Sequence, residues 1–167
     1  CHNLANIDIP DGVTTIGNYT FYDCSGLTSI KIPKSVTSIG SSAFYGCSGL
    51  TSIDIPESVT SIGSYAFEEC SSLTSIDIPE SVTIIEGSAF SGCNSLEAKL
   101  LIYDKGTKCY GWIGDRTKCT NVVIPEGVTS IGSSAFRSCS SLVSINIPKG
   151  VTSIGSSAFY GCSGLTS

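Results

Sequence analysis

The sequence has no methionine, one tryptophan and one histidine, and only 14% of its 167 residues are charged. Its nine Lys and Arg residues are outnumbered by fourteen Asp and Glu residues, which gives a net charge of −5. Binding to nucleic acid needs a stripe of basic side chains, so the composition argues against a nucleic-acid partner. No apolar run approaches the ~20 residues that span a bilayer, which argues against membrane insertion.

Hydrophobic residues, prolines and cysteines recur with a 23-residue period, which explains the skewed composition as repeated copying of one segment. All six phenylalanines and all six prolines fall in this register. The register is clearest in Cys1, Cys24, Cys47, Cys70, Cys93, Cys139 and Cys162, and in Leu4, Leu27, Leu50, Leu73, Leu96, Leu142 and Leu165. The single wider gap in each series equals two periods.

Each unit predicts two short strands joined by turns. In residues 47–69, alternation places Ile53 and Ile55 on one face and Asp54 on the other. Pro56 ends this strand because it has no N–H to donate to a neighbouring strand. β-branched residues favour a second strand over 59–62. The remaining segment is too short for an α-helix and predicts a turn or a 3₁₀ segment.

One unit cannot fold alone, because its seven or so inward side chains bury too little apolar surface to offset the entropy of ordering the backbone. Stacked units pair their strands and share one core. The sequence therefore predicts a β-rich solenoid of about seven coils, forming a single array over 1–167. Both ends lie inside a repeat, so we expect this array to be a fragment of a longer chain.

The recurring pattern Leu-x-x-Ile-x-Ile-Pro, then Val-Thr-x-Ile-Gly-x-x-Ala-Phe-x-x-Cys, resembles the BspA-like (treponemal-type) leucine-rich repeats. The resemblance covers nearly the whole chain and holds in register six times. It implies a right-handed leucine-rich-repeat solenoid whose Leu-x-x-Ile-x-Ile strand lines one face. It also implies a cell-surface or secreted protein of a host-associated microbe, with adhesion to host matrix proteins or to other cells.

Residues 94–121 depart from the pattern but keep the period, so we expect a degenerate coil there and not an inserted domain. By position, Trp112 replaces the usual Ala, Ile113 replaces Phe, and Cys119 replaces Leu. One interpretation is that Ile113 and Cys119 fill the core while Trp112 repairs the local packing. The other is that Tyr103, Tyr110 and Trp112 form an exposed aromatic binding spot. Residues 104–106 predict a tight turn, as at a hairpin tip.

The cysteines do not show the spacing of a metal site. Zinc sites use closely paired ligands such as Cys-x-x-Cys, and the chain has no such pair. Seven cysteines occupy one repeated position, which predicts free thiols buried as small apolar side chains. The remaining two, Cys109 and Cys119, are the better candidates for a disulfide, although free thiols are the favoured interpretation.

Catalysis finds no support in the sequence. His2 has no partner that the repeat would place beside it, and the degenerate coil offers Asp104 and Asp115 without a histidine. A nucleophilic or metal site would need residues that break the repeat. We therefore expect no enzyme activity, no cofactor and no bound metal.

Carboxylates gather at exposed positions of two successive coils. Asp54 and Asp77 lie between the paired isoleucines, and Glu57 and Glu80 follow the prolines. One interpretation is a solvated face that keeps the solenoid soluble. The other is an acidic strip for a basic segment of a partner. A Ca²⁺ site is disfavoured, because a flat stack of carboxylates lacks the loop geometry of an EF-hand.

Three functions remain open at this point. The leading hypothesis is a protein-binding or adhesion module that docks an extracellular protein. The second is end-to-end self-association, because neither end of the chain carries a polar cap. The third is a non-catalytic spacer or targeting arm of a larger surface enzyme.

Overall fold

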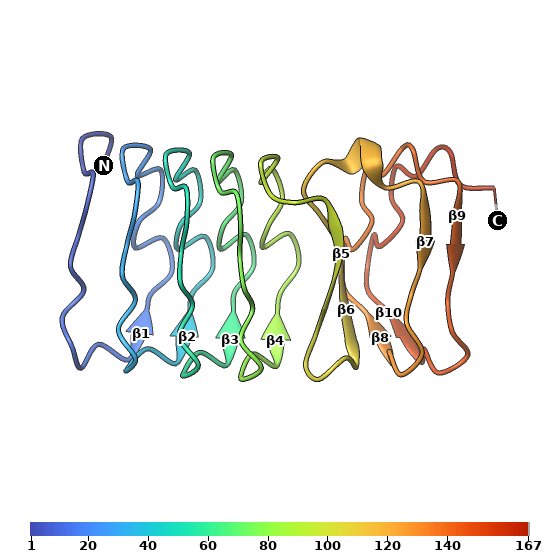
Figure 1. The fold of residues 1–167 in the computed structure, drawn as a ribbon, viewed down its shortest axis with the longest axis horizontal. Coiled ribbons are helices and arrows are strands. Elements are labelled where there is room, and N and C mark those ends of the chain that lie inside the picture. The colour runs from blue at the N-terminus through green and yellow to red at the C-terminus, as the bar shows by residue number, and fades with distance from the viewer. Residues whose placement is uncertain (167) are drawn as a thin grey trace. The chain divides into compact units, whose positions relative to one another are not determined.

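The computed structural model describes residues 1–166 and consists almost entirely of short strands and turns (Figure 1). It divides into two compact units, Cys1–Glu97 (unit 1) and Ala98–Ser167 (unit 2). The boundary falls inside the predicted degenerate coil. Among the described residues, no helix is long and apolar enough to cross a membrane. The strands are β1 (Thr15–Ile16), β2 (Ser38–Ile39), β3 (Ser61–Ile62), β4 (Ile84–Ile85), β5 (Lys99–Tyr103), β6 (Lys108–Ile113), β7 (Asn121–Val123), β8 (Ser130–Ile131), β9 (Ser144–Asn146) and β10 (Ser153–Ile154), with one 3₁₀ turn, η1 (Arg116–Lys118).

Unit 1 is a solenoid in which successive coils pair in parallel with a 23-residue spacing. Its sheet has the order β1-β2-β3-β4. Ile39 lies beside Ile16 and Ile62 in this sheet. The amide of Thr60 donates to the carbonyl of Thr37 at 2.8 Å. The amide of Thr37 makes the equivalent bond to the coil before it. The predicted solenoid fold and its period are confirmed.

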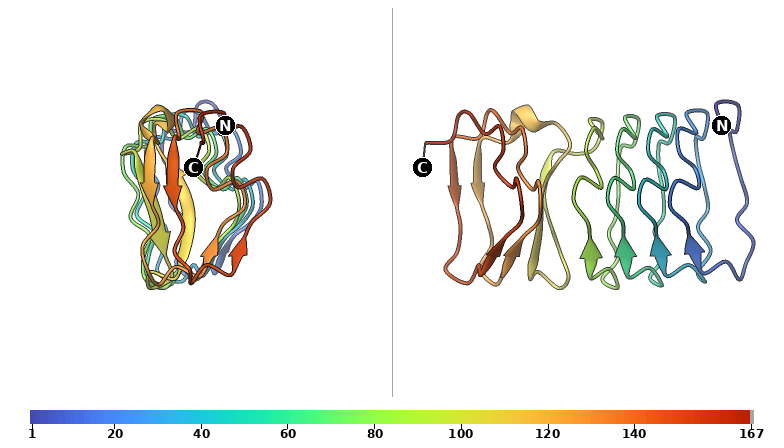
Figure 2. Two further views of the ribbon diagram at one scale, coloured as in Figure 1. Left: turned by 90° about the vertical axis from the view of Figure 1, so that its right-hand side faces the viewer. Right: turned by 180° about the vertical axis from the view of Figure 1, so that it is seen from behind.

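The Ile-x-Ile segments lie on the opposite side of the coils from these strands. In unit 2 they form the parallel pair β7 and β9, which the end-on view separates from β8 and β10 (Figure 2). In unit 1 the Ile-x-Ile segments pair only through single bridges, which join Asp8 to Lys31 and Lys31 to Asp54. The predicted strand at 53–55 is therefore an extended segment with one bridging residue.

The core of each unit is a set of like residues stacked from coil to coil. Phe44 lies between Phe21 and Phe67, with ring centroids 5.2 Å from each. In unit 2, Phe136 stacks on Phe159 in the same way. The leucine positions are fully buried in the same arrangement at Leu27, Leu50, Leu73 and Leu142. The apolar period of the sequence thus becomes continuous rows of packed side chains.

The repeated cysteines are free thiols that also bond one coil to the next. Cys70 Sγ donates to the carbonyl of Phe44 at 3.2 Å, and Cys47, Cys93 and Cys162 make the equivalent bond. Burial raises the pKa of Cys47 to about 12, so this thiol keeps its proton at neutral pH. All nine cysteines are unpaired, Cys109 and Cys119 included. The prediction of free thiols is confirmed. Their role as hydrogen-bond donors between coils was not predicted.

Serine and threonine hydroxyls supply further bonds between coils. Ser58 Oγ donates to the carbonyl of Val36 at 2.6 Å, and Ser35 and Ser81 repeat this bond on either side. Thr60 Oγ1 donates to the carbonyl of Thr37, which already accepts the amide of Thr60. The abundance of hydroxyl residues therefore has a structural cause beyond solubility.

Unit 2 begins with an antiparallel hairpin. β5 pairs with β6, and β6 pairs in parallel with β8 on its other side. The turn between β5 and β6 has positive φ at Asp104, Lys105 and Gly106, and Lys108 Nζ lies 3.0 Å from Asp104 Oδ2. The predicted tight turn at a hairpin tip is confirmed.

The degenerate coil is shifted by one residue relative to the regular coils, so part of the prediction made from position is wrong. Cys109 pairs with Ile131, one residue short of the regular period. The amide of Trp112 donates to the carbonyl of Ala135, and the amide of Phe67 donates to the carbonyl of Ala89 in the same way. Trp112 therefore takes the backbone place of Phe and not that of Ala. The stretch from Cys109 to Cys119, which contains η1, is one residue shorter than the stretch from Ile131 to Leu142, and this difference restores the period. The amide of Val143 donates to the carbonyl of Thr120 at the regular 23-residue spacing, so Cys119 occupies the leucine position again.

Complete denaturation should expose nine titratable thiols per chain, because no cysteine is paired. In the native protein, Cys1 should react fastest with a thiol reagent, since the other cysteines are buried or half-buried. Titration under both conditions measures this. A count of seven after denaturation would mean a disulfide and would contradict the account.

Ser58→Ala should lower the free energy of unfolding by about 1 kcal/mol, the typical worth of a hydrogen bond in a folded protein. Ser52→Ala is the matched control, because Ser52 is exposed and lies outside these inter-coil bonds. Chemical denaturation of the three proteins measures the difference. Equal losses in both variants would show that the hydroxyl bonds do not hold the coils together.

Candidate protein-binding surface

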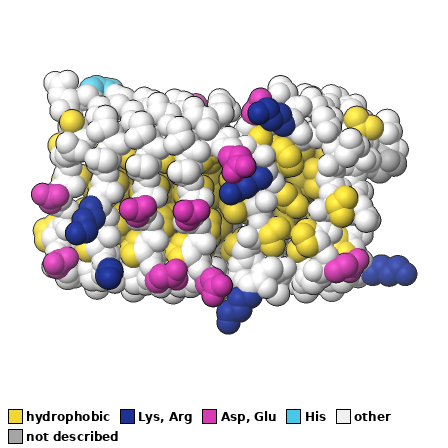
Figure 3. Space-filling view, in the orientation of Figure 1, with side chains coloured by type: hydrophobic (Ala, Val, Ile, Leu, Met, Phe, Trp, Pro, Cys, Tyr) yellow, Lys and Arg dark blue, Asp and Glu magenta, His cyan; other side chains and the backbone are white. Residues whose placement is uncertain are grey.

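The four carboxylates of the predicted acidic strip are exposed on the Ile-x-Ile face of unit 1. They are Asp54, Glu57, Asp77 and Glu80. This face carries two rows of charged side chains, which the space-filling view shows as separate acidic and basic groups (Figure 3). The 23-residue register places Asp54 and Asp77 at the same position of neighbouring coils, and it does the same for Glu57 and Glu80. Like charges on neighbouring strands repel, and the fold gains nothing from this arrangement.

The charges of the strip are not neutralised within unit 1. Lys31 is bridged through its backbone to Asp8 and Asp54, yet no salt bridge joins its ammonium group to either carboxylate in the described part of the chain. Glu57 and Glu80 likewise form no ion pair within residues 1–166. The strip therefore presents uncompensated negative charge to the solvent.

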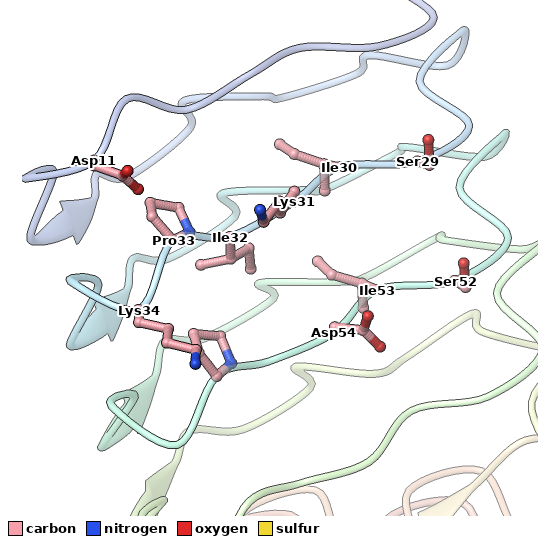
Figure 4. A pocket seen from close by; sticks show the side chains of 11 residues that line it. Asp11, Ser29, Ile30, Lys31, Ile32, Pro33, Lys34, Ser52, Ile53 and Asp54 are labelled. Carbon is pink, nitrogen blue, oxygen red and sulfur yellow. The ribbon is translucent and has the colours of Figure 1, made fainter.

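A groove of about 620 Å³ lies beside the strip. Its floor is apolar and comes from Ile30, Ile32 and Ile53 with two prolines, while its rim carries Lys31, Lys34, Asp11 and Asp54 (Figure 4). The lysines come from one coil and the carboxylates from the coils on either side. An apolar floor with a rim of both charges suits an extended peptide segment better than a single small ion.

The predicted exposed aromatic spot in unit 2 is wrong for Tyr110, which is only 7% exposed. Tyr110 lies in β6 next to Cys109, whose side chain belongs to the core of unit 2. Trp112 is half-buried against the core, and its indole N–H donates to the carbonyl of Asp115 at 3.1 Å. The other interpretation is confirmed, because Ile113 and Cys119 are both buried. Tyr103 is half-buried, with Lys108 Nζ 5.9 Å from its ring.

A charged group touches the buried thiols of unit 2. The Arg116 guanidinium donates to Cys139 Sγ at 3.5 Å and to the carbonyl of Arg137. The hydrogen bond from Cys119 and then the charge of Arg116 lower the pKa of Cys139. Cys139 has no exposed surface, so this thiol is not placed to attack a substrate. Within residues 1–166 no cluster of His, Cys, Asp and Glu could hold a metal ion.

Sequence reasoning missed a group of tyrosines on the turns that follow β1, β2 and β3. Tyr19, Tyr22 and Tyr65 are each about half exposed or more, and Tyr45 is half-buried. These turns lie on the side of unit 1 away from the Ile-x-Ile segments (Figure 2). The signal was available in the sequence, because Tyr22 and Tyr45 are one period apart, and Tyr19 and Tyr65 are two periods apart.

Each of these turns contains two positions with positive φ. The first is occupied by Tyr19, Ser42, Tyr65 and Ser88, and the second by Asp23, Gly46, Glu69 and Gly92. A residue with a side chain is disfavoured in this region of backbone space, whereas glycine enters it freely. The carboxylates of Asp23 and Glu69 extend over the glycine of the following coil, where a Cβ would approach them closely.

A family model described as "BspA type Leucine rich repeat region" matches residues 1–110 and 114–167 in six copies. No protein in a search of curated sequences is significantly similar to the chain.

Several solved structures of bacterial leucine-rich repeat proteins are similar. One from Treponema pallidum is 28% identical, with a TM-score of 0.59, and the match covers 97% of this chain and 78% of that protein. A leucine-rich cell surface protein from Faecalibacterium prausnitzii is 32% identical, with a TM-score of 0.62, and the match covers 99% of this chain and 47% of that protein.

The pneumococcal vaccine antigen PcpA is 20% identical and shares the fold, with a TM-score of 0.65; the match covers 98% of this chain and 50% of that protein. The chain therefore spans about half the length of the Faecalibacterium and pneumococcal proteins.

Glu69→Gly should raise the free energy of unfolding by about 1 kcal/mol, because glycine removes the cost of a positive φ at this position. The reverse change, Gly46→Ala, should lower it, since φ is +69° there and the new Cβ would lie 3.2 Å from Asp23 Oδ1. Thermal unfolding of both variants tests the pair. A loss of stability in Glu69→Gly would show that the carboxylate stabilises the coil.

Proposed function

The chain belongs to the BspA-type leucine-rich repeat proteins, and we propose that it is a protein-binding module of a cell-surface or secreted protein. Its ligand is an extracellular protein, from the host matrix or another cell surface. The module is non-catalytic, as repeat arrays of this fold usually are. The description of the Faecalibacterium relative as a cell surface protein supports the location.

The observation that carries this proposal is the uncompensated acidic strip of Asp54, Glu57, Asp77 and Glu80. Four exposed carboxylates stand in two opposed pairs without a cationic partner in the described chain. A basic segment of a ligand would remove the repulsion and gain charge-assisted hydrogen bonds. The strip thus favours a ligand segment that carries Lys or Arg.

The groove beside the strip supports a ligand of mixed character. The lysines on its rim suit carboxylates of the same ligand, and its isoleucine floor suits an apolar side chain. An extended segment that crosses successive coils would meet Lys31 and Lys34 first and the strip next. Alternating charges of this kind set the direction and register of a bound segment more than its affinity.

Neutralising the strip should weaken ligand binding about tenfold or more. The variant carries Asp54→Asn, Glu57→Gln, Asp77→Asn and Glu80→Gln, which keep the shape and remove the charge. Truncation of well-paired charges at protein interfaces costs on the order of 2–5 kcal/mol, and exposed pairs cost less. Binding is measured by surface plasmon resonance against a panel of immobilised matrix and plasma proteins at two salt concentrations.

The control carries Asp8→Asn and Glu126→Gln, which remove exposed carboxylates outside the strip and outside the groove. Its binding should stay close to that of the unchanged protein. Equal binding by the strip variant and the unchanged protein would reject the strip as the site. Failure of every panel protein to bind would count against the proposed function itself.

A further inference from the structure

The turns that follow β1 to β4 form three parallel rows of residues, each with the 23-residue spacing. The first row reads Tyr19, Ser42, Tyr65 and Ser88; the second reads Tyr22, Tyr45, Glu68 and Ser91; the third reads Asp23, Gly46, Glu69 and Gly92. Aromatic and acidic residues thus collect in the first three coils, while the fourth coil carries only serine and glycine. We call the tyrosines and carboxylates of these rows the tyrosine edge.

Three rings of the tyrosine edge contact one another and remain partly open to solvent. Tyr22 lies on Tyr45 with a centroid separation of 4.8 Å and an interplanar angle of 4°. Tyr19 packs against Tyr22 at 5.8 Å. Tyr19 keeps 61% of its surface exposed, and Tyr22 keeps 47%. An aromatic platform of this kind offers ring faces to a ligand at little cost in conformational entropy.

The fold does not require these residues. Tyr19 and Tyr65 have φ of 60° at a position where other coils carry serine, and Asp23 and Glu69 have positive φ where other coils carry glycine. Strained backbone positions of this kind collect at functional sites, where the strain serves a purpose other than stability. Asp23 and Glu69 are therefore disfavoured residues at positions that glycine would occupy without strain. Serine has the same positive φ as the tyrosines of the first row, so these tyrosines add ring surface without a change in backbone.

The tyrosine edge is negatively charged. Tyr22 and then Glu68, together with Glu69 and Asp23, raise the pKa of Tyr45, so the field of the carboxylates reaches the stacked rings. A histidine borders the edge at its first coil, where His2 Nε2 lies 3.8 Å from Asp23 Oδ2. A cation over the ring faces would be attracted by both the π electrons and the carboxylates.

Unit 2 contains such a cation at the same row. Arg137 and Tyr160 continue the second row, and the guanidinium carbon of Arg137 lies 5.4 Å from the Tyr160 ring centroid. The spacing of the coils thus brings a guanidinium over a tyrosine on the neighbouring coil. In unit 1 the same row carries two tyrosines and no arginine.

We propose that the tyrosine edge is a second docking surface, which takes arginine side chains from an exposed segment of a partner protein. The guanidinium planes lie on Tyr19, Tyr22, Tyr45 and Tyr65, and the carboxylates of Asp23 and Glu69 accept their N–H groups. Arginine is favoured over lysine because its planar group stacks on rings and pairs with carboxylates at once. This surface goes beyond the acidic strip of the proposed function and stands independently of it.

The probe is a fluorescent Gly/Ser peptide that carries several arginines, with matched lysine and citrulline versions. Fluorescence anisotropy with the whole chain should show binding of the arginine peptide, weaker binding of the lysine peptide and none of the citrulline peptide. Tyr22→Ser with Tyr45→Ser should reduce affinity about fivefold, since each exposed cation–π contact contributes a factor of about two to five. Asp23→Gly with Glu69→Gly should reduce it similarly.

These substitutions use residues that the chain carries at the same positions in other coils, so the fold is preserved. Tyr22→Phe with Tyr45→Phe keeps the rings and should keep the affinity. Tyr160→Ser is the control, and it should not change the affinity more than twofold. The serine and glycine variants are compared in a background with the acidic strip neutralised, because the strip of the proposed function would also attract arginine. Unchanged affinity in the serine and glycine variants would overturn the proposal. Binding of a neutral oligosaccharide in place of the arginine peptide would overturn it too, and would assign the edge to sugars.

Discussion

Unit 1 depends on the parallel pairing of neighbouring coils in a 23-residue register. The bond from the Gly63 amide to the carbonyl of Ile39, at 2.9 Å, recurs from coil to coil in unit 1. Once this register is set, every inward position faces its own copy, which stacks phenylalanine on phenylalanine and leucine on leucine. A coil on its own would leave these backbone groups unpaired, so stability comes from the contacts between neighbours.

The same register divides the residues into two classes. In the regular coils most inward positions hold one residue type, because a change in volume would be felt by the coils on both sides. Outward positions vary from coil to coil without disturbing the stack. The acidic strip, the lysines of the groove and the tyrosine edge are all outward variations within unit 1. The two docking surfaces that we propose therefore occupy positions where coils differ, on two separate faces of unit 1.

The sequence predicted the fold because its period determines which side chains are buried. The buried state of Cys119 and of the repeated cysteines followed from position, and the turn at 104–106 followed from its residue types. Ile113 was predicted to be buried, but at a position that Trp112 occupies. The burial of Tyr110 did not, because the antiparallel pairing of β5 with β6 breaks the repeat, so no regular coil offers a position to compare with Tyr110. The one-residue shift at Cys109 escaped notice for the same reason, since the total length of the coil is unchanged.

The candidate surfaces were predicted only in part. The acidic strip was found because carboxylates recur at a recognisable exposed position. The donor role of the thiols was missed, since spacing does not show which carbonyl a sulfur faces. The tyrosines were missed because their significance lies in exposure and ring stacking, which sequence spacing alone does not reveal.

Site-resolved amide hydrogen exchange of the native chain tests the register most directly. The amides of Phe44, Thr60, Gly63 and Phe67 all donate across a coil boundary in unit 1. If coil-to-coil pairing holds the unit together, these amides should be protected to a similar degree and lose protection together as denaturant is added. Rapid exchange at these amides, or loss of protection one coil at a time under native conditions, would contradict the account.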